Sequence, residues 1–167
     1  GFVNFAAEYI AEIAKCGVDL IQFDDDYRYG FLADTPACLC DNHIKIINDS
    51  IGENLTREEI KNHILTGDKN KVRDAYLKAN GDAFRDFALK MREAVDSVNP
   101  NIRLGACACM TSWDIDGTDA YELAKILAGG TKPFVRLIGA PYWAWKRAWG
   151  NKLQDVIELE RMESAWT

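Results

Sequence analysis

Apolar residues recur along the chain at two spacings, and the two spacings alternate. In 2–17 they return every three or four positions, which predicts a helix that ends at Gly17. The next stretch, 18–24 (VDLIQFD), is short and β-rich and predicts a strand. From 38 to 98 the helical spacing returns, with breaks at glycines. The repeating apolar positions of the first helix are Phe5, Ala6, Tyr9, Ile10 and Ile13.

Residues in the middle of the chain predict where helices begin and end. Thr56 and Glu59 have the spacing of a capping box, which predicts that a helix begins there. That helix is expected to stop at Gly67, and the long segment after it to end before Pro100.

Four further segments complete the pattern. Residues 101–110 (NIRLGACACM) predict a second strand, and 118–130 (TDAYELAKILAGG) a helix ended by two glycines. Residues 132–143 (KPFVRLIGAPYW) predict a third strand, and 150–165 a last amphipathic helix. Strands that alternate with helices favour parallel pairing with right-handed crossovers, so the expected fold class is α/β.

Two architectures suit this order: an open doubly wound sheet, or part of a TIM (β/α)₈ barrel. No glycine-rich phosphate loop follows any strand, which argues against nucleotide binding, and no cofactor is expected. Polar and aromatic residues instead follow every predicted strand, at 24–28, 111–114 and 141–145. A (β/α)₈ barrel carries its active site at the carboxyl ends of its strands, so the barrel is the favoured architecture.

Three strands cannot close a barrel, which takes about 250 residues. We therefore expect residues 1–167 to form a single domain that is the central portion of a barrel. The remaining strands would come from the rest of the protein or from another copy of the chain, because unpaired sheet edges need partners.

Composition narrows the possible partners. With 167 residues, 48% of them hydrophobic, the chain is large enough for one domain with a core. Its net charge of −6 argues against a nucleic-acid partner, and its apolar runs are too short to cross a membrane. Five cysteines form an odd count without a secretion signal, so reduced thiols in the cytoplasm are expected.

Alternation along the strands places individual side chains. Ile21 and Phe23 are expected to pack on the helices, so Gln22 and Asp24 point into the barrel. On the third strand the same alternation sends Arg136 inward. A buried guanidinium needs a carboxylate, and Asp24 is its predicted partner.

The acidic triplet Asp24, Asp25 and Asp26 has three interpretations: a solvated loop that caps a helix, a divalent cation site, or an acid–base cluster at a sugar site. Crowded carboxylates raise the pKa of one member, which keeps an acid protonated near neutral pH. The third interpretation is favoured by aromatic residues that follow the other two strands and that suit stacking on sugar rings. These residues are Trp113, Tyr142 and Trp143.

Cysteines also gather in two short motifs. Cys38, Cys40 and His43 lie within CLCDNH and offer possible zinc ligands, but their spacing is not the usual C-x₂-C pair and a fourth ligand is not evident. We therefore expect these cysteines to be structural and assign no metal. Cys107 and Cys109, among alanines and a glycine, are expected to fill a tight strand environment.

The order of these motifs resembles that of a known group of proteins. GVDLIQFDDDYRYG followed by ACLCDNHIKIIND and LTREEI is similar to bacterial (β/α)₈-barrel proteins related to glycoside hydrolases of the β-galactosidase type, clan A. In that group a strand ending in acidic residues precedes a loop with a C-x-C-x-x-[CH] signature. RLGACACM and KPFVRLIGAPYW resemble the next two strands, so the similarity covers nearly the whole chain.

The resemblance implies a hydrolase that acts on a carbohydrate substrate, with carboxylates after strands four and seven. Asp25 or Asp26 would then be the catalytic acid. Substrate would be bound by Asp24, Arg28, Trp113, Arg136, Tyr142 and Trp143. This sequence has Asp-Asp where clan A enzymes usually have Asn-Glu, and the second carboxylate would lie outside the chain. The chain alone is therefore expected to be inactive.

Two alternatives remain open at this stage. One is a non-catalytic carbohydrate-binding or scaffold barrel, in which the acidic residues only anchor Arg28 and Arg136. The other is a metal-dependent lyase or isomerase on the same fold. Binding without turnover would favour the first, and loss of activity with a chelator would favour the second.

Overall fold

The computed structural model describes residues 1–24, 27, 29, 36–66, 68–109 and 117–138. These residues form helices and strands in the alternating order that the sequence predicts. The elements are α1 (Phe2–Lys15), β1 (Leu20–Phe23), α2 (Asp41–Ile51), α3 (Arg57–Leu65), α4 (Lys71–Asp96), β2 (Arg103–Cys109), α5 (Ala120–Ala128) and β3 (Val135–Ile138). The predicted helix at 150–165 lies outside the described residues.

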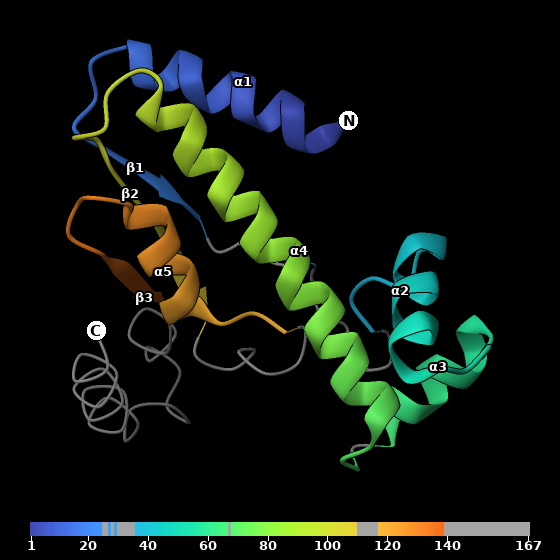
Figure 1. Cartoon of the computed structure of the whole chain (residues 1–167). Helices are drawn as coiled ribbons and strands as arrows, with labels where there is room; N and C mark the ends of the chain where they lie inside the picture. Colours follow the sequence, from blue (N-terminus) through green and yellow to red (C-terminus); the bar gives the residue numbers. More distant parts are fainter. Residues whose placement is uncertain (25–26, 28, 30–35, 67, 110–116, 139–167) are drawn as a thin grey trace, which may run out of the picture.

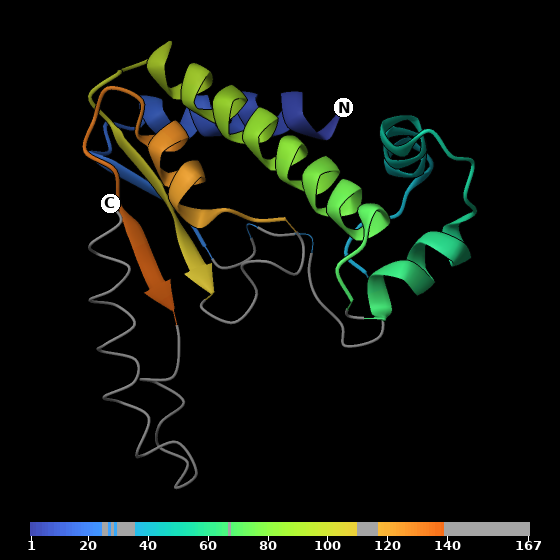
Figure 2. The ribbon, with the colours of Figure 1, turned by 60° about the horizontal axis from the view of Figure 1, so that its bottom comes forward.

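The three strands form a parallel sheet in the order β1-β2-β3, which confirms the predicted α/β class. Gln22 is in register with Gly105, and Cys107 with Arg136. Helices α1, α4 and α5 lie on the same side of this sheet (Figure 2). Register partners on neighbouring strands point to the same face, so this pairing decides which side chains can meet.

Helix α4 joins two parts of the fold. One end packs against α1, α5 and the sheet, and the other end packs against α2 and α3 (Figure 1). Its apolar face contributes Phe84, Ala88, Met91 and Val95 to the core under the sheet, as the spacing predicts. Its first turns contribute to a second core, formed by Ile47, Ile60, Val72, Tyr76 and Ala79.

The predicted strand faces are also observed. Ile21 and Phe23 pack against the core under the sheet, together with buried Leu104 and Ala106 of β2. Gln22 and Cys107 belong to the alternate positions and therefore face the other way.

Local end signals form as predicted. The Thr56 side chain accepts a hydrogen bond from the Glu59 backbone N–H, and the Thr56 N–H donates to Glu59 Oε2 at 2.8 Å. Gly17 follows α1 with a φ of +78°, a left-handed conformation that glycine adopts without a Cβ penalty.

The buried side chain of Arg92 ties α4 to its neighbours. Its Nε donates to Asp96 Oδ1 at 2.9 Å, and its Nη1 donates to the carbonyls of Ile102 at 2.9 Å and Leu127 at 3.2 Å. Nη2 approaches the same Asp96 oxygen at 2.6 Å without the geometry of a hydrogen bond. One guanidinium thus connects the end of α4, the start of β2 and the end of α5.

A second close approach fixes the chain before α5. Gly117 has a φ of +83°, and a Cβ at this position would lie 2.1 Å from the carbonyl oxygen of Leu77. Only glycine can therefore lie this close to α4.

Helix α1 is less covered than its repeating apolar positions suggest. Ile10 is buried, but Phe5 and Tyr9 are exposed. They line an open hollow of about 690 Å³ between α1, β1 and α4, together with Phe23 and Phe87.

Among the described residues, none of the helices combines the length and apolar character that crossing a bilayer requires.

Candidate functional site

Polar side chains meet beside the carboxyl end of β1, on the sheet face opposite the helices. The thiol of Cys107 is at their centre: its Sγ accepts hydrogen bonds from Gln22 Nε2 at 3.3 Å and Arg136 Nη1 at 3.3 Å, and donates to Asp24 Oδ1 at 3.4 Å. Arg136 Nη1 lies 3.5 Å from the same Asp24 oxygen. We call Gln22, Asp24, Cys107 and Arg136 the strand-end cluster.

The predicted pairing of Asp24 with Arg136 is confirmed, but the arginine is not buried as expected. The accessible fraction of the side chain is 47% for Arg136 and 72% for Asp24. Water therefore screens this ion pair, and both groups keep surface with which to meet a solute.

Cys107 is the buried member of the cluster. Burial raises the pKa of its thiol, the hydrogen bond to Asp24 raises it further, and Arg136 acts in the opposite direction. A raised pKa keeps the sulfur protonated, so it serves as a hydrogen-bond link rather than as a nucleophile.

Of the predicted site residues, the structure brings two together, Asp24 and Arg136. The remaining six lie outside the described residues: Asp25, Asp26, Arg28, Trp113, Tyr142 and Trp143. Cys107 and Gln22 were not among the predicted site residues, although strand alternation already puts Gln22 on the face of Asp24.

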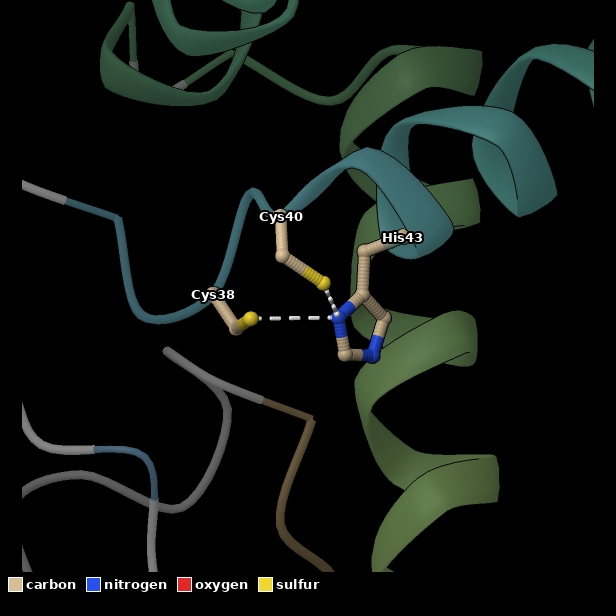
Figure 3. Close-up of side chains that lie close together, drawn as sticks. All are labelled: Cys38, Cys40 and His43. Atoms are coloured by element: carbon tan, nitrogen blue, oxygen red, sulfur yellow. Dashed lines mark hydrogen bonds between the residues drawn. The ribbon is translucent and has the colours of Figure 1, made fainter. Parts of the chain in front are cut away.

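A second cluster lies in residues 38–43, where the chain enters α2. Cys38 Sγ and Cys40 Sγ lie 3.2 Å and 3.4 Å from the same atom, His43 Nδ1 (Figure 3). The three ligand-type atoms all lie within 4.8 Å of one another. We call these residues the thiol–imidazole cluster. They were predicted to be structural, without a metal assignment.

Local structure explains why these three residues converge. Cys40 is the N-cap of α2, so its extended backbone turns the chain into the helix, and His43 follows in the first turn. The Ala37 N–H donates to the Tyr76 hydroxyl at 2.7 Å, which anchors the segment to α4. Arg57 Nε donates to the Leu39 carbonyl at 3.0 Å, between the two cysteines.

The protonation states of the cluster differ from residue to residue. The backbone N–H of His43 lowers the pKa of the Cys40 thiol, as helix N-termini do for cysteines. Burial raises the pKa of Cys38 and lowers the pKa of the His43 imidazole. The His43 ring therefore favours the neutral form, which has a lone pair to offer.

Two tyrosines that follow β1, Tyr27 and Tyr29, contact α4. The Tyr27 hydroxyl donates to the Phe84 carbonyl at 3.1 Å, and burial raises the pKa of Tyr27. The Tyr29 ring contacts Phe84 with centroids 4.6 Å apart and meets the His43 ring edge-on at 5.7 Å. Tyr29 thus packs between α4 and the thiol–imidazole cluster.

Comparison with protein-family models, curated proteins and solved structures finds no match to this chain. The chemistry of the strand-end cluster and of the thiol–imidazole cluster therefore carries the functional conclusions.

Proposed function

We propose that the chain is the central part of a (β/α)₈ barrel that acts on carbohydrates as a glycoside hydrolase. Sequential strand order with α1, α4 and α5 on one side supports the barrel. A doubly wound sheet reverses its strand order and its helix-covered face at one point, and no such reversal occurs among the described strands. In a barrel the face with Cys107 and Arg136 is the interior.

The contact between Asp24, Cys107 and Arg136 carries this proposal. Asp24 directly follows the carboxyl end of β1, and the strand register sets Cys107 and Arg136 beside it. Barrel enzymes hold their substrates at the carboxyl ends of their strands. A carboxylate, a guanidinium and the amide of Gln22 supply both acceptors and donors, as sugar hydroxyls require. Both charged groups are accessible enough to contact a solute.

The sequence places further candidate groups directly after the same strands. Asp25 or Asp26 acts as the acid that protonates the leaving oxygen, and Arg28 binds substrate beside Asp24. The aromatic platforms are Trp113, Tyr142 and Trp143. The second carboxylate belongs to a strand outside this chain, about 5–5.5 Å from the first for retention or about 6.5–9.5 Å for inversion.

Leaving-group dependence tests the acid role in the full-length protein. A good aryl leaving group needs little protonation, whereas an alkyl leaving group needs a full proton transfer. Substitution of the acid, Asp25→Asn or Asp26→Asn, should lower kcat/KM on an alkyl glycoside about 10²–10⁴-fold and on an activated aryl glycoside much less. Asp86→Asn, an exposed position on α4, is the control and should leave both rates unchanged. Equal losses on both substrates would contradict the acid role.

The rival proposal is a barrel that binds carbohydrate without cleaving it. It is favoured by the fact that Asp24 is already engaged by Arg136 and Cys107, as an anchoring acidic residue would be. Calorimetry with a panel of sugars beside a hydrolysis assay separates the two. Binding without turnover in the full-length protein would establish the rival.

A further inference from the structure

We propose that Cys38, Cys40 and His43 form a binding site for a thiophilic divalent cation, with Zn²⁺ as the natural occupant. This site is separate from the strand-end cluster and does not depend on the proposed hydrolase activity. Three observations support it: the distances between the donor atoms, the types of donor, and the contacts that hold the segment in place.

The geometry matches the spacing of metal ligands. With Zn–S of about 2.3 Å and Zn–N of about 2.0–2.1 Å, a tetrahedral ion separates sulfur and nitrogen ligands by about 3.5 Å. The two sulfur-to-Nδ1 distances are 3.2 Å and 3.4 Å, so small shifts would admit the ion.

Hydrogen bonding alone does not explain why both sulfurs approach one atom. An imidazole nitrogen has either one lone pair or one N–H, so it makes one good hydrogen bond. Cys38 and Cys40 nevertheless both point at Nδ1 (Figure 3). Ligands that share one ion converge in this way, because each points its donor atom at the same centre.

The donor set selects the ion. Two thiolates and an imidazole are the ligands of zinc, whereas magnesium and calcium require oxygen. Two thiolate charges also neutralise a divalent ion. No fourth side chain of a ligating type joins the cluster among the described residues, so solvent or another donor completes the tetrahedron.

The site is held in place before any ion binds. The Tyr76 hydroxyl accepts a hydrogen bond from the backbone N–H of Ala37, just before Cys38. Arg57 donates to the carbonyl of Leu39 at 3.0 Å and to the carboxylate of Asp41 at 2.9 Å. The ligands therefore lose little freedom when they bind, which favours affinity. An ion at Nδ1 also fixes the His43 ring against which Tyr29 packs.

Cobalt and zinc titrations of the metal-free chain test the proposal. Co²⁺ should bind one per chain and give a thiolate-to-cobalt charge-transfer band, which Zn²⁺ abolishes by displacement. Cys38→Ser or Cys40→Ser should weaken binding by at least about a hundred-fold. Cys16→Ser and His63→Asn change an exposed thiol and an exposed imidazole elsewhere and should leave binding unchanged.

Alkylation of the wild-type chain gives a second readout that does not depend on the folding of any variant. Zn²⁺ should protect Cys38 and Cys40 from iodoacetamide, as located by mass spectrometry, while Cys16 reacts at the same rate with and without the ion. The proposal is overturned if no charge-transfer band appears, if zinc leaves Cys38 and Cys40 unprotected, or if the control variants weaken binding as much as the cysteine variants.

Discussion

Arg136 Nη1 lies 3.5 Å from Asp24 Oδ1, although Asp24 follows the first strand and Arg136 belongs to the third. The strand register brings them together, because Phe23, the last residue of β1, pairs with Ala106, and the next residue of β2, Cys107, pairs with Arg136. The Cys107 thiol lies between them and bonds to both.

This ion pair is predicted to contribute little to stability. Both side chains are widely accessible, and screened pairs of this kind contribute about 0–1 kcal/mol. A double-mutant cycle with Asp24→Asn and Arg136→Met, followed by urea unfolding, should give a coupling energy below about 1 kcal/mol. A coupling of several kcal/mol would mean that the pair is buried in solution and serves the fold.

Arg92 is predicted to matter far more to the fold. Arg92→Met removes the donor to two carbonyls, and each buried acceptor left without a partner costs about 1–3 kcal/mol. The free energy of unfolding should therefore fall by about 2–4 kcal/mol. Lys90→Met on the same helix breaks only an exposed ion pair with Glu93 and should change it by less than about 0.5 kcal/mol. Similar losses for both variants would contradict the role of Arg92.

Gly117 and Gly17 offer a matched pair of left-handed glycines. Gly17→Ala adds a Cβ in open space, so only the backbone penalty of about 1–2 kcal/mol applies. Gly117→Ala adds the same penalty and drives the Cβ against the Leu77 carbonyl, so its loss should exceed about 3 kcal/mol. Denaturant unfolding measures both. Equal losses would show that the segment before α5 can move away from α4.

The capping box predicts a pH dependence of stability. The backbone N–H of Thr56, followed by its hydroxyl, lowers the pKa of Glu59 in the folded chain. A carboxyl whose pKa is depressed by folding stabilises the fold above its unfolded pKa of about 4.3, and this stabilisation is lost as the pH falls through the folded pKa.

Glu59→Gln keeps an acceptor at the cap but cannot titrate, so its stability should fall less than that of the wild type as the pH drops from about 6 to about 3. Thermal unfolding across this range measures the difference. Glu58→Gln, the adjacent residue outside the capping box, is the control for the loss of one carboxylate from the first turn of α3. A wild-type slope in Glu59→Gln would contradict the prediction.

The elements and one contact of the strand-end cluster could be predicted because their signals are local or periodic. Glycine stops, the Thr56–Glu59 spacing and helical periodicity each concern neighbouring residues. The contact of Asp24 with Arg136 needs only strand alternation and parallel pairing. The same rules also place Cys107 on that face, but its small neighbours pointed to tight packing instead.

The thiol–imidazole cluster could not be predicted with the same rules. Its convergence depends on the turn into α2 at Cys40 and on contacts from Tyr76 and Arg57, which come from other helices and leave no periodic trace. The exposure of Phe5 and Tyr9 is equally non-local, because helical spacing reports an apolar face but not what covers it.

Helix α4 supplies side chains to both hydrophobic cores, from Val72 and Tyr76 near its start to Met91 and Val95 near its end. Both α2–α3 and the sheet therefore pack against the same helix, α4, and the two parts should unfold together as one cooperative unit. Backbone amide protons in the middle of α4 should therefore exchange with solvent only through global unfolding.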